Sequence, residues 1–129
     1  MTAQKVLEEI MQDEEFSEKL STMEDPDEMA EAIQEQAKGY DISDADAELS
    51  EEDLAEVVGG MSRLAAHKII LDTLWDIAWK KKLRHNPKNI EAALKIADGD
   101  MKWLNKASWK LLGTGLKMLG LPYLAALIP

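Results

Sequence analysis

Apolar residues recur at intervals of three and four through most of this 129-residue chain, and this is the spacing of one face of an α-helix. The pairs Asp25-Pro26 and Asn86-Pro87 are typical helix starts, because proline's missing N–H costs nothing at the first helical position. The pattern therefore predicts an all-α fold. The clearest repeats are Val6, Leu7, Ile10 and Met11, then Phe16, Leu20 and Met23, then Met29, Ala30, Ile33 and Ala37, and later Ile90, Ala93, Leu94 and Ala97.

Glycine predicts where several helices end. Gly39 is expected to supply a left-handed stop, whereas residues 63–83 contain neither glycine nor proline and are expected to continue as one helix. On that helix, one apolar face is expected from Leu64, Leu71, Leu74, Trp75 and Ala78.

The C-terminal part predicts further helices. After a break at residues 97–100, Asp100 is expected to cap a third helix, and Gly113, Gly115 and Gly120 are expected to interrupt the next segment. The last 19 residues are strongly apolar, but three glycines and Pro122 favour a buried helix or hairpin over a membrane span. Residues 61–129 should thus form a compact bundle of three to four helices.

Charge divides the chain sharply at residue 60. Residues 1–60 contain three basic and twenty acidic side chains, a net charge of −17. Residues 61–129 contain twelve basic and five acidic side chains, a net charge of +7, together with all four tryptophans. An asymmetry of this size predicts two parts with different partners or fates.

The boundary itself is the stretch LSEEDLAEVVGG, residues 49–60. Ser50 and Asp53 have the spacing of a capping box, and Leu49 and Leu54 have that of a hydrophobic staple, so a short helix is expected to fray at Gly59-Gly60. A glycine pair most commonly serves as a helix cap and linker. Here, however, apolar residues precede it at fixed places, including Val57, Leu54 and Leu49.

This stretch resembles the double-glycine leaders that are cut by papain-like peptidase domains of peptide-exporting ABC transporters. Residues 1–60 as a whole resemble the Nif-eleven type (nitrogen-fixation-protein-like) leader peptides of ribosomally made peptide natural products. Further shared features are Phe16 and Leu20 in an acidic helix, Asp25-Pro26, and the run Ala37-Lys38-Gly39-Tyr40.

The resemblance implies that residues 1–60 are a leader, and that export removes it by a cut between Gly60 and Met61. It implies two kinds of protein partner, the transporter peptidase and a tailoring enzyme. The peptidase would recognise Leu49, Ser50, Asp53, Leu54 and Val57, and the tailoring enzyme would contact Phe16 and Leu20.

The product, residues 61–129, contains no cysteine, so disulfides, thiolate metal sites and lanthionine rings are excluded. In general character it resembles a large helical, cationic, tryptophan-containing bacteriocin. On that interpretation an anionic membrane is its target, because lysine is attracted to anionic headgroups and tryptophan settles at their level. The expected contacts are Trp75, Trp79, Lys80, Lys81, Lys82, Trp103 and Trp109. The alternative is that the tryptophans are core residues and the lysines provide solubility.

The sequence contains no pattern that supports catalysis, a cofactor or a metal site. Asp72 and Asp76 lie four residues from Lys68 and Lys80, so surface ion pairs are favoured over a catalytic carboxylate pair. His67 and His85 are the only histidines, and neither belongs to a cluster with ligand spacing. Acidic residues 41–48 have the Asp-x-Asp spacing of a calcium loop but lack the glycine and the distal glutamate of an EF-hand. Nucleic acid ranks third among the possible partners, because the basic half contains no recognised nucleic-acid-binding motif.

Two interpretations follow. The first is a secreted-peptide precursor with a leader at 1–60 and a product at 61–129. The alternative is an uncleaved, non-enzymatic interaction protein in which Gly59 and Gly60 form a hinge between acidic and basic helical modules.

Overall fold

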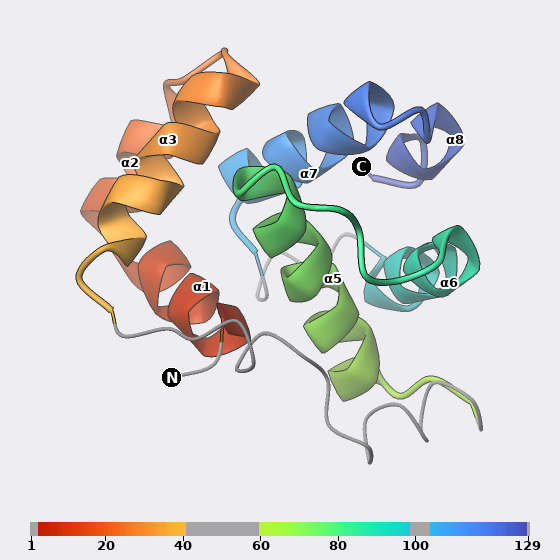
Figure 1. The fold of residues 1–129 in the computed structure, drawn as a ribbon. Helices are drawn as coiled ribbons and strands as arrows, with labels where there is room; N and C mark the ends of the chain where they lie inside the picture. Colours follow the sequence, from red (N-terminus) through yellow and green to blue (C-terminus); the bar gives the residue numbers. More distant parts are fainter. Residues whose placement is uncertain (1–2, 41–59, 99–103, 129) are drawn as a thin grey trace.

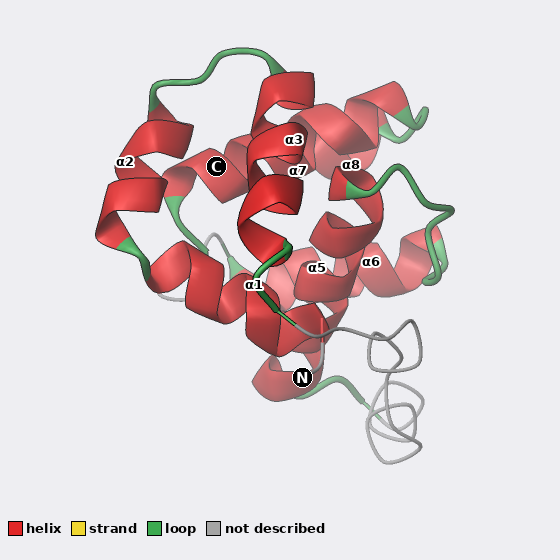
Figure 2. Ribbon diagram, turned by 60° about the vertical axis from the view of Figure 1, so that its left-hand side comes forward, coloured by secondary structure: helices red, strands yellow, loops and turns green. Residues whose placement is uncertain are grey.

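The computed structural model describes residues 3–40, 60–98 and 104–128. These residues form seven helices and no strand, which confirms the all-α prediction (Figure 2). The helices are α1 (Ala3–Gln12), α2 (Glu14–Ser21), α3 (Pro26–Ala37), α5 (Arg63–Ala78), α6 (Pro87–Ala97), α7 (Lys106–Met118) and α8 (Pro122–Ala125).

Side-chain caps explain where the helices begin. Asp25 and Asn86 cap α3 and α6, each directly before a proline, as the sequence predicts. Such a cap satisfies one of the N–H groups that the first turn of a helix leaves unpaired. The bonds are Asp13 Oδ1 to Phe16 N (3.2 Å), Asp25 Oδ1 to Asp27 N (3.0 Å), Ser62 Oγ to Ala65 N (3.1 Å), Asn86 Oδ1 to Asn89 N (2.9 Å) and Asn105 Oδ1 to Ser108 N (2.8 Å).

The helix ends differ more from expectation. α5 ends at Ala78 rather than near Leu83, because Lys80 takes a left-handed conformation (φ 55°) and the Lys81 N–H donates to the Asp76 carbonyl oxygen at 2.8 Å. Glycine usually occupies such a position, so the sequence gives no signal for this end. Gly39, in contrast, does not adopt a left-handed conformation.

The third helix of the C-terminal part also differs from its prediction. α7 begins at Lys106 with Asn105 as its cap, whereas Asp100 lies outside the described residues. The helix continues through Gly113 and Gly115 to Met118 instead of being interrupted. It ends in a turn at Gly120, where φ is +80° and the next N–H donates to the Leu116 carbonyl oxygen at 2.9 Å.

α5 is the central helix of the fold. In Figure 1, α1, α2 and α3 lie on one side of it, and α6 and α8 lie on the other. α1 and α3 pack on α5, while α2 and α3 also pack on α7. Because other helices cover α5 from several sides, residues on more than one face of it are buried. Leu64 is predicted to belong to the apolar face of this helix, but it is 57% exposed. Helices from both sides of Gly60 therefore share one hydrophobic core.

Gly115 permits a close approach of α7 to α5. A Cβ atom added at this position would overlap the Ile77 side chain, at its Cγ2 atom. At Gly113, two residues earlier, an added Cβ would meet the Ile128 Cδ1 atom at 3.5 Å, which is ordinary contact.

We predict that two alanine substitutions on α7 affect stability differently. Gly115→Ala should lower the free energy of unfolding by about 1–3 kcal/mol, because overpacking forces α5 and α7 apart. Gly113→Ala should leave stability unchanged or raise it by up to ~1 kcal/mol, because alanine is the better helix former. Urea unfolding followed by circular dichroism measures both, and equal effects would contradict the close contact at Gly115.

Candidate functional site

The structure places the predicted cleavage point in an exposed, non-helical position. Gly60 is exposed, has a φ of +121°, and has open space around it, since an added Cβ would meet no atom within 4 Å. Met61 is partly buried at the edge of the core, and α5 begins two residues later. Gly59 and the predicted recognition residues Leu49, Ser50, Asp53, Leu54 and Val57 lie outside the described residues.

The two sides of this boundary are joined by polar contacts as well as apolar packing. The Gln4 Nε2 atom donates to Asp72 Oδ1 at 2.7 Å, which ties α1 to α5. The Gln34 side chain of α3 donates to the Ala78 carbonyl oxygen, in the last turn of α5. The Asn105 Nδ2 atom donates to Ser17 Oγ at 2.8 Å. These hydrogen bonds, together with the His67–Glu8 ion pair of 3.1 Å, connect the acidic helices to the basic part.

Phe16 and Leu20, the residues expected to contact a tailoring enzyme, lie in the core of the structure. Phe16 is 7% exposed and Leu20 is 0% exposed. In this fold an enzyme cannot touch either side chain. Recognition through them would require α2 to leave the surface of α7.

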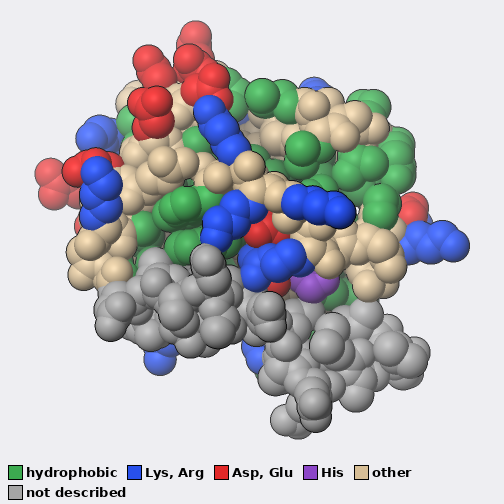
Figure 3. Space-filling model, viewed as in Figure 1, with side chains coloured by type: hydrophobic (Ala, Val, Ile, Leu, Met, Phe, Trp, Pro, Cys, Tyr) green, Lys and Arg blue, Asp and Glu red, His purple; other side chains and the backbone are tan. Residues whose placement is uncertain are grey.

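Asp72 and Asp76 form a buried polar cluster with Arg84 and His85. Both carboxylates are only 1% exposed, so the expected surface pairs with Lys68 and Lys80 are wrong. The Arg84 Nη2 atom lies 3.0 Å from Asp72 Oδ1 and 2.9 Å from Asp76 Oδ1, and His85 Nε2 lies 3.1 Å from Asp72 Oδ2. Figure 3 shows acidic side chains near the middle of this face, among basic ones and beside the histidine.

The early end of α5 creates this cluster. After Lys80 the chain turns back along α5, which brings Arg84 and His85 to carboxylates eight to thirteen residues earlier. Burial raises the pKa of Asp72 above its ordinary value, against the hydrogen bond from His85 and the charge of Arg84, which lower it. With Gln4, Arg84 and His85 all bonded to Asp72, we interpret the cluster as structural.

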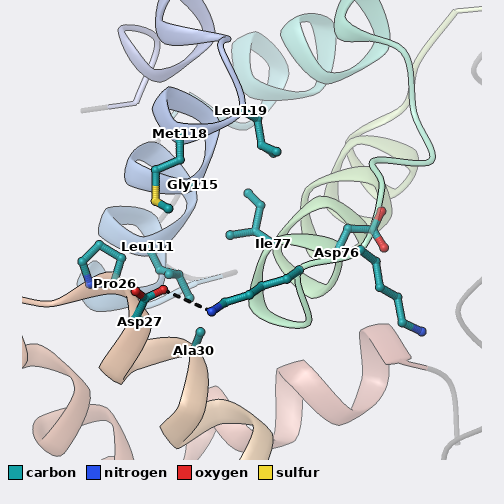
Figure 4. A pocket seen from close by; sticks show the side chains of 11 residues that line it. Pro26, Asp27, Ala30, Asp76, Ile77, Leu111, Gly115, Met118 and Leu119 are labelled. Carbon is teal, nitrogen blue, oxygen red and sulfur yellow. Dashed lines mark ion pairs between the residues drawn. The ribbon is translucent and has the colours of Figure 1, made fainter.

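Lys80 forms an ion pair with Asp27 of α3 instead of the expected pair with Asp76. Its Nζ atom lies 3.5 Å from Asp27 Oδ1, across the mouth of a cavity of about 320 Å³ between α3, α5 and α7 (Figure 4). Both partners are more than half exposed, so this pair contributes little to stability. Ile77, Leu111, Met118 and Leu119 line the cavity.

The tryptophans are mostly core residues. Trp75 and Trp109 are 5% and 3% exposed, and Trp79 is partly buried and stacked on Trp75 with ring centroids 3.8 Å apart. Trp103 lies outside the described residues. Of the expected membrane contacts that the structure describes, Lys80, Lys81 and Lys82 are exposed. Membrane contact through Trp75 or Trp109 would require the fold to open.

Sequence reasoning missed two groups of residues. The first is the partnership of Gln4, Arg84 and His85 with the buried carboxylates, which depends on a tertiary turn. The second is an exposed apolar turn between α7 and α8, at Met118, Leu119 and Tyr123. The signal for the turn is present in the sequence, since Gly120 and Pro122 punctuate an apolar run there.

Comparisons with known proteins identify no relative. No family model, no curated protein and no solved structure matches the chain. None of the described helices has the length and apolar character needed to cross a membrane. In the same described ranges, no group of three or more histidine, cysteine or acidic side chains could hold a metal ion.

We predict that Asp72→Ala lowers the free energy of unfolding by about 2 kcal/mol, because it removes the acceptor of Gln4 and His85 and one of the two carboxylates that Arg84 binds. Lys95→Ala is the control: it breaks the exposed Lys95–Glu91 pair of 3.2 Å and should cost no more than about 0.5 kcal/mol. Urea unfolding measures both. Equal losses would show that the buried cluster does not hold α1, α5 and the following loop together.

Proposed function

We propose that this chain is the precursor of a secreted, ribosomally made peptide, with a leader at residues 1–60 and a product at residues 61–129. The proposed processing enzyme is the peptidase domain of an ABC transporter, which cuts between Gly60 and Met61. The observation that carries this proposal is the exposed position of Gly60, where an added Cβ atom would meet no other atom within 4 Å, at the point where the net charge reverses. The resemblance of residues 49–60 to double-glycine leaders supports it.

The accessibility of Gly60 matters because a peptidase must draw the substrate backbone into its active site. Gly60 and Met61 precede the Ser62 cap, so a cut there does not break a helical hydrogen bond of α5. Glycine has no side chain to fill a narrow channel, which suits a peptidase that admits only extended, small residues before the cut.

The mass of the material released by producing cells tests the cut. We expect a species that begins at Met61, and we expect Leu54→Asp or Gly59→Val to abolish its release, because each removes a feature of the peptidase recognition stretch. Leu64→Asp is the matched control beyond the cut, since Leu64 is exposed in the fold. Detection of only the full chain, retained inside the cell, would contradict the proposal.

The shared core gives the cut a structural consequence. α1 and α3 cover α5, and α2 and α3 cover α7, so removing residues 1–60 uncovers apolar side chains of both helices. Each large apolar side chain contributes about 1.5–3 kcal/mol when buried. The product must therefore bury this surface again, and we propose that an anionic bilayer receives it. On this proposal the leader keeps the product inactive until export.

Dye leakage from anionic vesicles tests this role of the leader. We expect the chain cut after Gly60 and separated from its leader to cause leakage at concentrations at least tenfold below those of the uncut chain, because only the former has the apolar surface uncovered. Adding back residues 1–60 should suppress the leakage. Equal activity of the cut and uncut forms would rule out masking by the leader.

The same core favours a second candidate function, an uncleaved helical interaction protein. Buried residues from both sides of Gly60, such as Leu7, Ile33 and Leu71, belong to one cluster, as in an ordinary single domain. A shared core argues against the idea that Gly59 and Gly60 form a hinge between two separately packed modules. Finding the intact 129-residue chain as the cell's final form would favour this function over the precursor.

A further inference from the structure

Exposed apolar side chains gather at the turn between α7 and α8. Among the described residues, four large hydrophobic side chains are exposed, and three of them belong to this turn: Met118 (69%), Leu119 (49%) and Tyr123 (55%). The fourth, Leu64, lies at the start of α5. Figure 3 shows hydrophobic side chains gathered over the region where α7 ends and α8 lies. We call Met118, Leu119 and Tyr123 the apolar tip.

The backbone holds the apolar tip in place. The turn at Gly120 closes with a hydrogen bond of 2.9 Å from the Leu121 N–H to the Leu116 carbonyl oxygen. Leu116 and Leu124, on either side of the turn, are fully buried, so the residues that flank the tip are anchored in the hydrophobic core. The exposure of the tip is thus a property of the fold rather than of a loose end.

Basic residues follow the tip along α7. Lys117 directly precedes it, and Lys117, Lys110 and Lys106 all line one hollow of about 360 Å³ between α7 and α8. Trp109, Ala125 and Ile128 also line this hollow, and no acidic side chain of the described residues does. Met118 and Leu119 line the cavity on the opposite side of α7, together with Asp27 and Asp76, so the lysines of α7 flank the tip only on its α8 side. An apolar tip flanked on one side by lysines is an arrangement by which proteins lie on anionic lipid surfaces.

We propose that the apolar tip and the lysines of α7 form a docking surface for anionic bilayers, and that the uncut chain already possesses it. The inference rests on the membrane target in the proposed function, but it does not depend on the cut after Gly60. Since the whole chain carries a net charge of −10, attraction must come from this local patch. The acidic helices α2 and α3 pack on α7, and the Lys110 Nζ atom lies 3.5 Å from the Met23 carbonyl oxygen, so the lysines and the apolar tip must together outweigh the repulsion of these helices from the bilayer.

A second copy of the chain is the competing occupant of this surface. In a two-fold symmetric pair, the same patch faces itself, and Lys106, Lys110 and Lys117 would approach their own copies. Repulsion between like charges disfavours that pairing, whereas phosphate headgroups would neutralise all three lysines. The charge pattern therefore favours lipid.

A thiol-reactive, polarity-sensitive dye tests the surface in the full chain, because the sequence contains no cysteine. The two labelled variants are Met118→Cys at the tip and Leu64→Cys as the control at another exposed apolar position. With vesicles rich in phosphatidylglycerol, the dye at position 118 should shift to the blue and the dye at position 64 should not. Vesicles of phosphatidylcholine alone should produce a much smaller shift.

The lysines are tested in the labelled Met118→Cys background. Lys110→Gln with Lys117→Gln should weaken binding to the anionic vesicles about 25-fold, that is, about fivefold for each lysine removed. The control is Lys19→Gln with Lys38→Gln, which removes the same charge from exposed sites on α2 and after α3 and should leave affinity nearly unchanged. Circular dichroism checks that all variants are folded.

Three results would overturn the inference. They are equal dye responses at positions 118 and 64, equal binding to both kinds of vesicle, and a blue shift at position 118 that follows protein concentration without lipid, which would indicate a second copy. None of these results bears on the cut after Gly60, which the released mass decides separately.

Discussion

The packing of α5 between helices from both halves of the chain is the constraint on which the rest of the structure depends. α5 follows directly after the proposed cleavage point, yet α1 and α3 of the acidic half cover it. Burial of apolar surface is the main force that stabilises such an arrangement. Opposite net charges of −17 and +7 on the two halves add attraction, but the contacts that fix the geometry are apolar.

Hydrogen bonds also connect α1 and α3 to α5. Gln4 bonds to Asp72, and Gln34 bonds to the Ala78 carbonyl oxygen in the C-terminal turn of α5, so α1 and α3 each supply a hydrogen-bond donor to a polar group of α5. Losing residues 1–60 would therefore uncover apolar surface and also remove a partner from Asp72. In the proposed precursor, this makes cleavage a conformational event as well as a covalent one.

The sequence predicted the helix starts better than the helix ends. Asp25-Pro26 and Asn86-Pro87 were predictable because capping is a local interaction. The end of α5 was not, since Lys80 takes a left-handed conformation that its residue type does not favour. For the candidate site, the glycine pair and its charge boundary were visible in the sequence. The burial of Phe16, Trp75 and Trp109 was not, because it depends on which helices cover one another.

Native-state hydrogen exchange, read by mass spectrometry on the uncut chain, tests the shared core most directly. If α1 and α3 belong to one cooperative unit with α5, the slowest amides of all three helices should open with the same free energy, within about 1 kcal/mol. Destabilisation by urea should then lower these free energies together. The account would be contradicted if amides of α1 and α3 opened several kcal/mol more easily than those of α5, because the acidic helices would then be separable from the core.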